Sequence, residues 1–221
     1  MRSAAGLAAL LVAAQIASAQ PAATTTDARS RDAVARAGRA LERAARQRQR
    51  ERNDARYDDV FRKYSKRYFG IGFDWRHFKA QGMAESNLDP AARSWVGARG
   101  IMQLMPATYN AISSKNREFR AIDDPEWNIA AGIMHDRYLW GYWAKEVPDE
   151  RERLDFMYGS YNAGQGTIGR AHRAARDQQL DHDRWANIER VAPVVPRWRY
   201  RETLGYVRKI RANMDSIPKG R

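Results

Sequence analysis

The aromatic residues of this chain are confined to one part of it. All 23 of them (7 Trp, 10 Tyr and 6 Phe) lie at Tyr57 or beyond in a sequence of 221 residues. Because aromatic side chains supply much of a folded core, this distribution predicts one folded domain over residues 57–221. Segment 20–56 is rich in alanine and arginine instead, with ten Arg against five acidic residues between positions 27 and 56. Its helically spaced apolar positions are mostly alanine and bury little area, so we expect a basic arm that is helical or disordered.

Within the domain, apolar residues recur every three to four positions, which is the spacing of amphipathic helices. Glycines and prolines separate these segments, and runs of alternating β-branched residues are missing. The sequence therefore predicts an all-α domain, with a short β-turn or hairpin after Asp89. Helices are expected over residues 60–69, 75–85, 106–113, 128–143, 150–162 and 201–214.

Residues 1–19 have the pattern of a secretory signal peptide. Arg2 precedes an Ala/Leu/Val run that is short for a bilayer span, and Ala17-Ser18-Ala19 forms an A-x-A cleavage pattern. We expect cleavage after Ala19 and export to a bacterial periplasm, with an uncleaved N-terminal anchor as the alternative. The sequence has no cysteine, which excludes disulfides and thiolate metal sites.

The formal net charge of +13 favours an acidic partner. Nucleic acid, anionic lipid and the polyanionic bacterial cell wall all fit that description. The histidines show no spacing typical of metal ligands and are interpreted as structural or surface residues, so we expect no metal and no cofactor. They are His77, His135, His172 and His182.

Glu85 lies at the end of an apolar helical segment, just before Asn87 and Pro90, where the helix is expected to end. Apolar surroundings and the negative end of a helix dipole both disfavour an ionised carboxylate and raise its pKa. A carboxylic acid that keeps its proton near neutral pH can protonate a leaving-group oxygen. An ordinary surface glutamate at a helix end shows the same local pattern, so Glu85 alone does not decide the function.

Two further stretches combine small, polar and aromatic residues. Gly97 and Gly100 would let backbone approach a ligand closely, and Gln103 is an amide in an apolar run that needs partners if it is buried. Tyr161 and Asn162 end a helix in a glycine turn. A ring beside an amide suits a sugar, although a core tyrosine next to a helix cap explains this pair equally well.

Taken in order, these stretches resemble the lytic transglycosylase domain of the soluble (SLT) type, glycoside hydrolase family 23, from about Trp75 to Ile210. The family has a lysozyme-like fold. The blocks are Glu85-Ser86, Ser94 to Thr108, Asp124 to Leu139, Tyr161-Asn162-Ala163-Gly164 and Glu202-Thr203-x-x-Tyr206-Val207. The family usually has Arg after the Glu-Thr pair, whereas this chain has Leu204, and Arg197, Arg199 or Arg201 would have to substitute for it.

The resemblance implies cleavage of the β-1,4 bond between N-acetylmuramic acid and N-acetylglucosamine in peptidoglycan, without water or metal. Glu85 would be the single acid/base, and the product would end in 1,6-anhydro-N-acetylmuramic acid. The expected partner is the glycan strand, with a basic surface toward the anionic wall, no nucleic acid and a monomeric protein. The residues implied to line the cleft are Ser94, Gln103, Met105, Tyr161, Asn162, Glu202 and Tyr206. For Glu202, an ion pair with Arg201 or Lys209 is an equally good explanation.

Other functions stay open at this point. A goose-type lysozyme shares the fold but hydrolyses, and a hydrolase with paired carboxylates needs a second acid at about 5–9.5 Å. Asp89, Asp123 and Asp124 lie where helix caps and turns are expected. A catalytically silent wall-binding module, a basic nucleic-acid-binding protein and an anchored phage lysis enzyme are the remaining alternatives.

Overall fold

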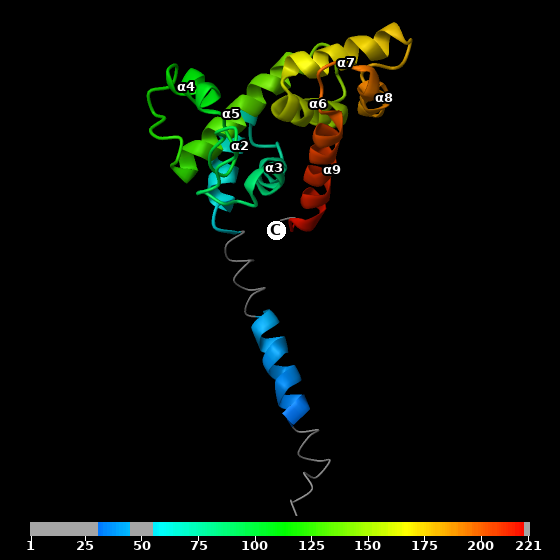
Figure 1. Cartoon of the computed structure of the whole chain (residues 1–221). Helices are drawn as coiled ribbons and strands as arrows, with labels where there is room; N and C mark the ends of the chain where they lie inside the picture. Colours follow the sequence, from blue (N-terminus) through cyan, green and yellow to red (C-terminus); the bar gives the residue numbers. More distant parts are fainter. Residues whose placement is uncertain (1–30, 45–54, 219–221) are drawn as a thin grey trace, which may run out of the picture. The chain divides into compact units, whose positions relative to one another are not determined.

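The computed structural model describes residues 31–44 and 55–218. The chain divides into two units, residues 1–50 and 51–221. In the first, residues 31–44 form one helix whose side chains are all exposed, as its alanine-rich composition leads one to expect (Figure 1). The signal peptide and its cleavage after Ala19 lie outside the described residues. In the described ranges, no helix combines the length and apolar content that crossing a membrane requires.

The second unit is helical, and the all-α prediction is confirmed for the described residues. Its helices are α2 (Asp58–Phe69), α3 (Arg76–Ser86), α4 (Pro106–Ser113), α5 (Pro125–Trp143), α6 (Glu150–Ala163), α7 (Gln165–Asp177), α8 (Trp185–Val191), the 3₁₀ helix η1 (Ala192–Val194) and α9 (Tyr200–Ser216). Each helix expected from the sequence is present within a few residues of its expected bounds. The sequence did not predict α7 and α8, because α7 is mostly Ala, Gly and Arg and α8 has only seven residues.

Local sequence signals explain where the helices begin and end. The Asp124 carboxylate accepts hydrogen bonds from the Glu126 and Trp127 backbone N–H groups, and Pro125 fills the first turn of α5. Pro106 plays the same part in α4. At the C-terminal end of α3, Asn87 adopts the left-handed conformation, so the helix ends directly after Glu85 and Ser86.

The core is built around α6, which packs against α5, α7, α8 and α9, while α3 packs between α2 and α9 (Figure 1). Phe78 of α3, Phe156 of α6 and Val207 of α9 are fully buried at these contacts. Gly159 of α6 lets Trp185 of α8 approach closely, because a Cβ there would lie 2.3 Å from the indole ring. The packing holds the C-terminal end of α3 against α9.

Residues 87–105 form the expected turn structure rather than a strand pair. Isolated antiparallel bridges join Arg93 to Arg99 and Arg99 to Leu104. The Asn128 side chain of α5 supports the turn, since its amide donates to the Arg99 carbonyl at 2.9 Å and its oxygen accepts from the Met102 N–H at 2.8 Å. Gly100 has φ +74°, and a Cβ there would meet the Asn128 side chain at 2.5 Å. Gly100 therefore allows close packing against Asn128, whereas the sequence suggested that it would allow close approach to a ligand.

Candidate active site

Glu85 lies in the last turn of α3, where α9 packs across it. The Tyr206 hydroxyl of α9 donates a hydrogen bond to Glu85 Oε1 at 2.6 Å. Lys209, one turn further along α9, donates from Nζ to the Ala84 carbonyl at 2.6 Å. The cation is thus held beside the carboxylate by the backbone and not by a direct ion pair with it.

Burial raises the pKa of Glu85 from 4.5 to about 7, and the Tyr206 hydrogen bond and the Lys209 charge lower it by less. Burial among apolar side chains is the cause that the sequence around Glu85 predicted. With this pKa the carboxyl group is present in both protonation states near neutral pH. It can therefore give a proton to one oxygen and take a proton from another within the same reaction.

Tyr161 comes close to the same carboxylate from the end of α6. Its hydroxyl donates to the Met102 carbonyl at 2.8 Å, and the charge of Glu85 is, after burial, the next cause that raises the pKa of Tyr161. The His135 ring packs edge-on against Tyr161, with ring centroids 5.3 Å apart. Burial lowers the pKa of His135 to about 4, so this imidazole is neutral near pH 7.

The turn at residues 87–105 is joined to α3 through Ser86, whose hydroxyl donates to the Ile101 carbonyl at 2.8 Å. Gln103 donates its amide to the carbonyls of Ala92 and Gly100, so it has the partners that its partial burial requires. Ser94 Oγ accepts from the Ala98 N–H at 2.9 Å. Gln103 and Ser94 thus stabilise the turn through hydrogen bonds to its backbone. Met105, the last residue of the turn, is 42 % exposed.

Two of the expected site residues, Asn162 and Glu202, are exposed and do not bond to Glu85 in the described part of the chain. Asn162 is exposed in the last turn of α6. Glu202 is exposed in the first turn of α9 and pairs with Arg199 at 3.0 Å, where the sequence suggested Arg201 or Lys209. The structure thus joins Tyr206 to Glu85 directly and brings Tyr161 near it, while Asn162 and Glu202 lie at the periphery.

Position 204 departs from the usual arginine for a reason that the structure makes plain. Leu204 is 7 % exposed and belongs to the hydrophobic core. Of the arginines that were expected to substitute for it, Arg199 is engaged with Glu202, and Arg201 stacks over the ring of Tyr200 at 5.9 Å. The apolar side chain at 204 therefore packs α9 and takes no part in an ionic site.

The acidic residues considered as a second catalytic group all have structural partners. Asp124 caps α5, Asp123 pairs with Arg93 and Arg99, and Asp89 accepts from the Ala91 N–H at 2.9 Å. This agrees with the capping and turn roles expected from their positions. None of the three bonds to Glu85 in the described residues, which leaves Glu85 as the one carboxylate held by Tyr206.

One buried carboxylate near Glu85, that of Asp136, was not predicted from the sequence. Asp136 of α5 is fully buried, and its Oδ1 accepts a hydrogen bond from the Gln81 amide at 3.2 Å, one helical turn before Glu85. Burial raises the pKa of Asp136 well above 3.8; the Gln81 hydrogen bond lowers it and the Glu85 charge adds to the rise. Without exposure, Asp136 cannot hold a water molecule against a sugar. It therefore lies behind the site and does not offer an exposed second carboxylate.

Comparison with known proteins places this geometry in a family. Residues 60–183, more than half of the chain, match the family described as "Transglycosylase SLT domain". The chain belongs to this family. The matched region includes Glu85, Tyr161 and the turn between α3 and α4, whereas Tyr206 and α9 lie beyond it.

Individual relatives agree with the family match. The chain is 34% identical over 155 residues to a membrane-bound lytic murein transglycosylase F of Marinobacter nauticus, covering 69% of this chain and 29% of the relative. It is 32% identical over 176 residues to that of Vibrio cholerae serotype O1, covering 73% and 31%. The chain thus spans about three tenths of the length of these relatives. Among solved structures, the 70 kDa soluble lytic transglycosylase from Escherichia coli matches 72% of this chain and 23% of its own, with 27% identity and a TM-score of 0.49.

Proposed function

We propose that this chain is a peptidoglycan lytic transglycosylase. The observation that carries the proposal is the state of Glu85, whose pKa of about 7 and hydrogen bond from Tyr206 equip it to donate and then accept a proton. Membership of the SLT family and the similarity to lytic murein transglycosylases support the choice of substrate. The bond cleaved is the β-1,4 linkage between N-acetylmuramic acid and N-acetylglucosamine.

The proposed reaction uses Glu85 twice. The protonated carboxyl group first donates to the glycosidic oxygen as the bond to C1 of the muramoyl residue breaks, which releases the N-acetylglucosamine hydroxyl. The resulting carboxylate then removes the proton from the muramoyl C6 hydroxyl, and that oxygen attacks C1 to close the 1,6-anhydro ring. The proton balance closes on Glu85, so no water is consumed. A buried acid with Tyr206 as its hydrogen-bond donor supports both protonation states in turn.

The substrate-binding roles of Ser94, Gln103, Met105, Tyr161, Asn162, Glu202 and Tyr206 are part of this proposal. A groove of about 510 Å³ supports a binding path that leads to Tyr161, since it includes His135, whose ring packs on Tyr161. It lies between α4 and α5 and is lined by Thr108, Ile112, Met134, His135 and Tyr138, among others. Apolar walls with a few polar groups suit the faces and hydroxyls of sugar rings.

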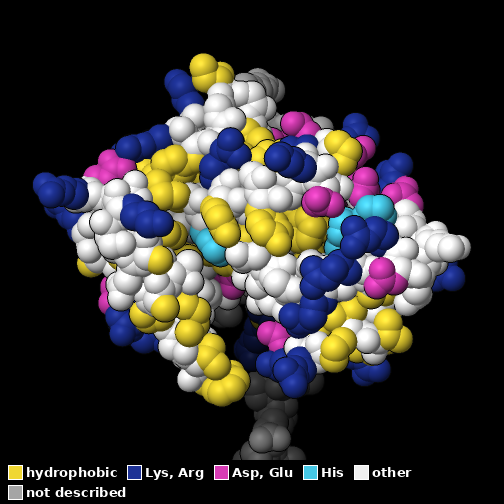
Figure 2. All heavy atoms as spheres, turned by 90° about the horizontal axis from the view of Figure 1, so that it is seen from above, with side chains coloured by type: hydrophobic (Ala, Val, Ile, Leu, Met, Phe, Trp, Pro, Cys, Tyr) yellow, Lys and Arg dark blue, Asp and Glu magenta, His cyan; other side chains and the backbone are white. Residues whose placement is uncertain are grey.

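We further propose that the protein acts in the periplasm, with residues 1–19 as a cleaved signal peptide and 20–56 as a basic arm before the domain. The net charge of +13 favours association with the anionic wall. Figure 2 shows Lys and Arg side chains over much of the face that it presents, interspersed with acidic and hydrophobic ones. Such an arrangement suits diffuse attraction to a polyanion better than docking at one basic patch.

Hydrolysis is the rival reaction, because a lysozyme acts on the same bond with water as the nucleophile. Digestion of purified sacculi followed by mass spectrometry separates the two, since hydrolysis adds one water to the product and anhydro-ring closure adds none. We expect muropeptides ending in 1,6-anhydro-N-acetylmuramic acid. Reducing N-acetylmuramic acid ends would assign the hydrolytic reaction instead, and an absence of both would leave only a wall-binding role.

Replacing Tyr206→Phe should move the pH dependence of kcat/KM and reduce its maximum. The lost hydrogen bond stabilises the Glu85 carboxylate, so its removal raises the pKa of Glu85 by about one unit. Activity needs protonated Glu85 and falls as pH rises through this pKa, near 7 in the native protein. The alkaline limb of the variant should therefore lie at higher pH. Tyr200→Phe, at the start of the same helix, is the matched control, and an unmoved limb in Tyr206→Phe would contradict the assignment.

A further inference from the structure

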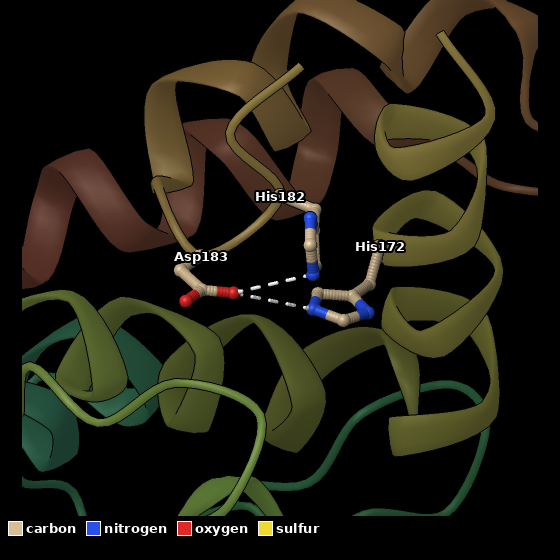
Figure 3. Close-up of side chains that lie close together, drawn as sticks. All are labelled: His172, His182 and Asp183. Carbon is tan, nitrogen blue, oxygen red and sulfur yellow. Dashed lines mark ion pairs between the residues drawn. The ribbon is translucent and has the colours of Figure 1, made fainter. Parts of the chain in front are cut away.

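A second cluster of chemically capable side chains lies outside the site of Glu85. His172 belongs to α7, and His182 and Asp183 belong to the loop that connects α7 to α8. The three side chains point toward one another in Figure 3, with Asp183 Oδ1 at 3.8 Å from His172 Nε2 and 3.6 Å from His182 Nε2. Each offers one ligand atom, and these atoms all lie within 4.8 Å of one another.

Two of these atoms are buried without a hydrogen-bond partner, namely His172 Nε2 and Asp183 Oδ1. His172 is only 5 % exposed, and its ring packs against Trp143 and Phe156. A buried polar atom without a partner costs free energy comparable to a lost hydrogen bond. The three ligand atoms therefore lie around one small space, and two of them lack a hydrogen-bond partner.

We propose that His172, His182 and Asp183 form a binding site for a divalent transition-metal ion, with Zn²⁺ as the preferred occupant. Two imidazoles and one carboxylate suit Zn²⁺, whereas Mg²⁺ and Ca²⁺ prefer all-oxygen sites. With bonds of about 2.0–2.2 Å, the ligand atoms around a tetrahedral Zn²⁺ lie about 3.4 Å apart. The two distances from Asp183, 3.6 and 3.8 Å, are close to this spacing. The three ligand atoms lie within 4.8 Å of one another, so the two imidazoles have to move closer together around the ion.

The ion would have a fourth position that none of these three residues fills, and the side chains of His182 and Asp183 are 34% and 36% exposed. We assign water to it. Bound metal would join α7 to the loop directly before Trp185, the residue that seats α8 against Gly159 of α6. The ion would therefore stabilise the α7–α8 connection, at a place that does not depend on the proposed reaction at Glu85.

The test uses the full chain without a polyhistidine tag, stripped with a chelator and then titrated with Zn²⁺ by calorimetry. We expect one Zn²⁺ per chain with a Kd on the order of 1 µM, and a Tm that rises with Zn²⁺ but not with Mg²⁺ or Ca²⁺. A Co²⁺ derivative should show the visible absorption of a tetrahedral site. Failure of the native chain to bind one Zn²⁺ would overturn the proposal.

Variants at the partly exposed ligands avoid disturbing the core around His172. Asp183→Asn and His182→Gln should each weaken Zn²⁺ binding by at least about tenfold and abolish the Tm rise. Asp177→Asn is the matched control at the end of α7; Asp177 is exposed and is not one of the three ligands, so Zn²⁺ binding should be unchanged. Retained binding in both ligand variants would place the ion elsewhere and reject the site.

Discussion

Glu85→Gln is expected to abolish the release of 1,6-anhydromuropeptides from purified sacculi. Glutamine has the shape of glutamic acid but neither donates a proton to the glycosidic oxygen nor removes one from the C6 hydroxyl. General acid–base catalysis contributes about 10²–10⁴-fold in rate, and Glu85 would supply both halves of it. We therefore expect the initial rate to fall by at least about 10³-fold, measured by chromatography of the soluble muropeptides.

The same variant should remain folded. Its amide oxygen can still accept the Tyr206 hydrogen bond, and it removes a carboxylate whose native pKa, about 7, lies above the ordinary value of 4.5. The stability that the native carboxyl group contributes is present below pH 4.5 and is lost as pH rises to about 7. At pH 8 the Tm of Glu85→Gln should thus be no lower than that of the native chain. Glu118→Gln, which breaks only the exposed pair with Arg67, is the control that keeps full activity.

The helices could largely be predicted from the sequence because their signals are local. Pro106, Asp124 and Pro125 mark helix starts through backbone chemistry that does not depend on the rest of the fold. The rise in the pKa of Glu85 could also be anticipated, since apolar neighbours precede it in the chain. By contrast, α7 contains few large apolar residues and α8 has only seven residues, so neither helix stands out in the sequence. Tertiary contacts, for example Trp185 against Gly159, determine them instead.

The site could be predicted only as far as linear motifs extend. Tyr206 and Glu85 are 121 positions apart, and only the resemblance to a family indicated that both belong to one cleft. Gln81 and Asp136 carry no motif, and each looks like an interruption of an apolar helix. The pairing of His172 with His182 depends on how the loop after α7 returns, which spacing alone does not reveal. Apart from α7 and α8, what the sequence did not predict is therefore the contacts between helices.

Asp136→Asn is expected to stabilise the chain increasingly as pH rises. Asp136 Oδ2 and Gln81 Oε1 are both buried without partners, while Gln81 Nε2 donates to Asp136 Oδ1. One proton on Oδ2, donated to Oε1, would satisfy both atoms in a cyclic acid–amide pair. An asparagine amide supplies that N–H permanently, so the variant keeps the pair. Asp136→Leu, the contrasting variant, leaves both polar atoms of Gln81 without partners and should cost about 1–3 kcal/mol.

The sign of the pH effect follows from the raised native pKa of Asp136. Its contribution to stability is fully present below the unfolded pKa, about 3.9, and is lost as pH rises from there toward the native value. Asparagine does not titrate, so Asp136→Asn should gain about 1.4 kcal/mol per pH unit over the native chain in that window. Urea unfolding at pH 5, 6 and 7 measures the difference. If Asp136 were ionised in the folded chain, the gain in stability would not grow with pH. In that case, removing the Asp136 charge would also lower the pKa of Glu85 and shift the alkaline limb of kcat/KM to lower pH. A neutral Asp136 leaves that limb in place, so the two measurements together decide its protonation state.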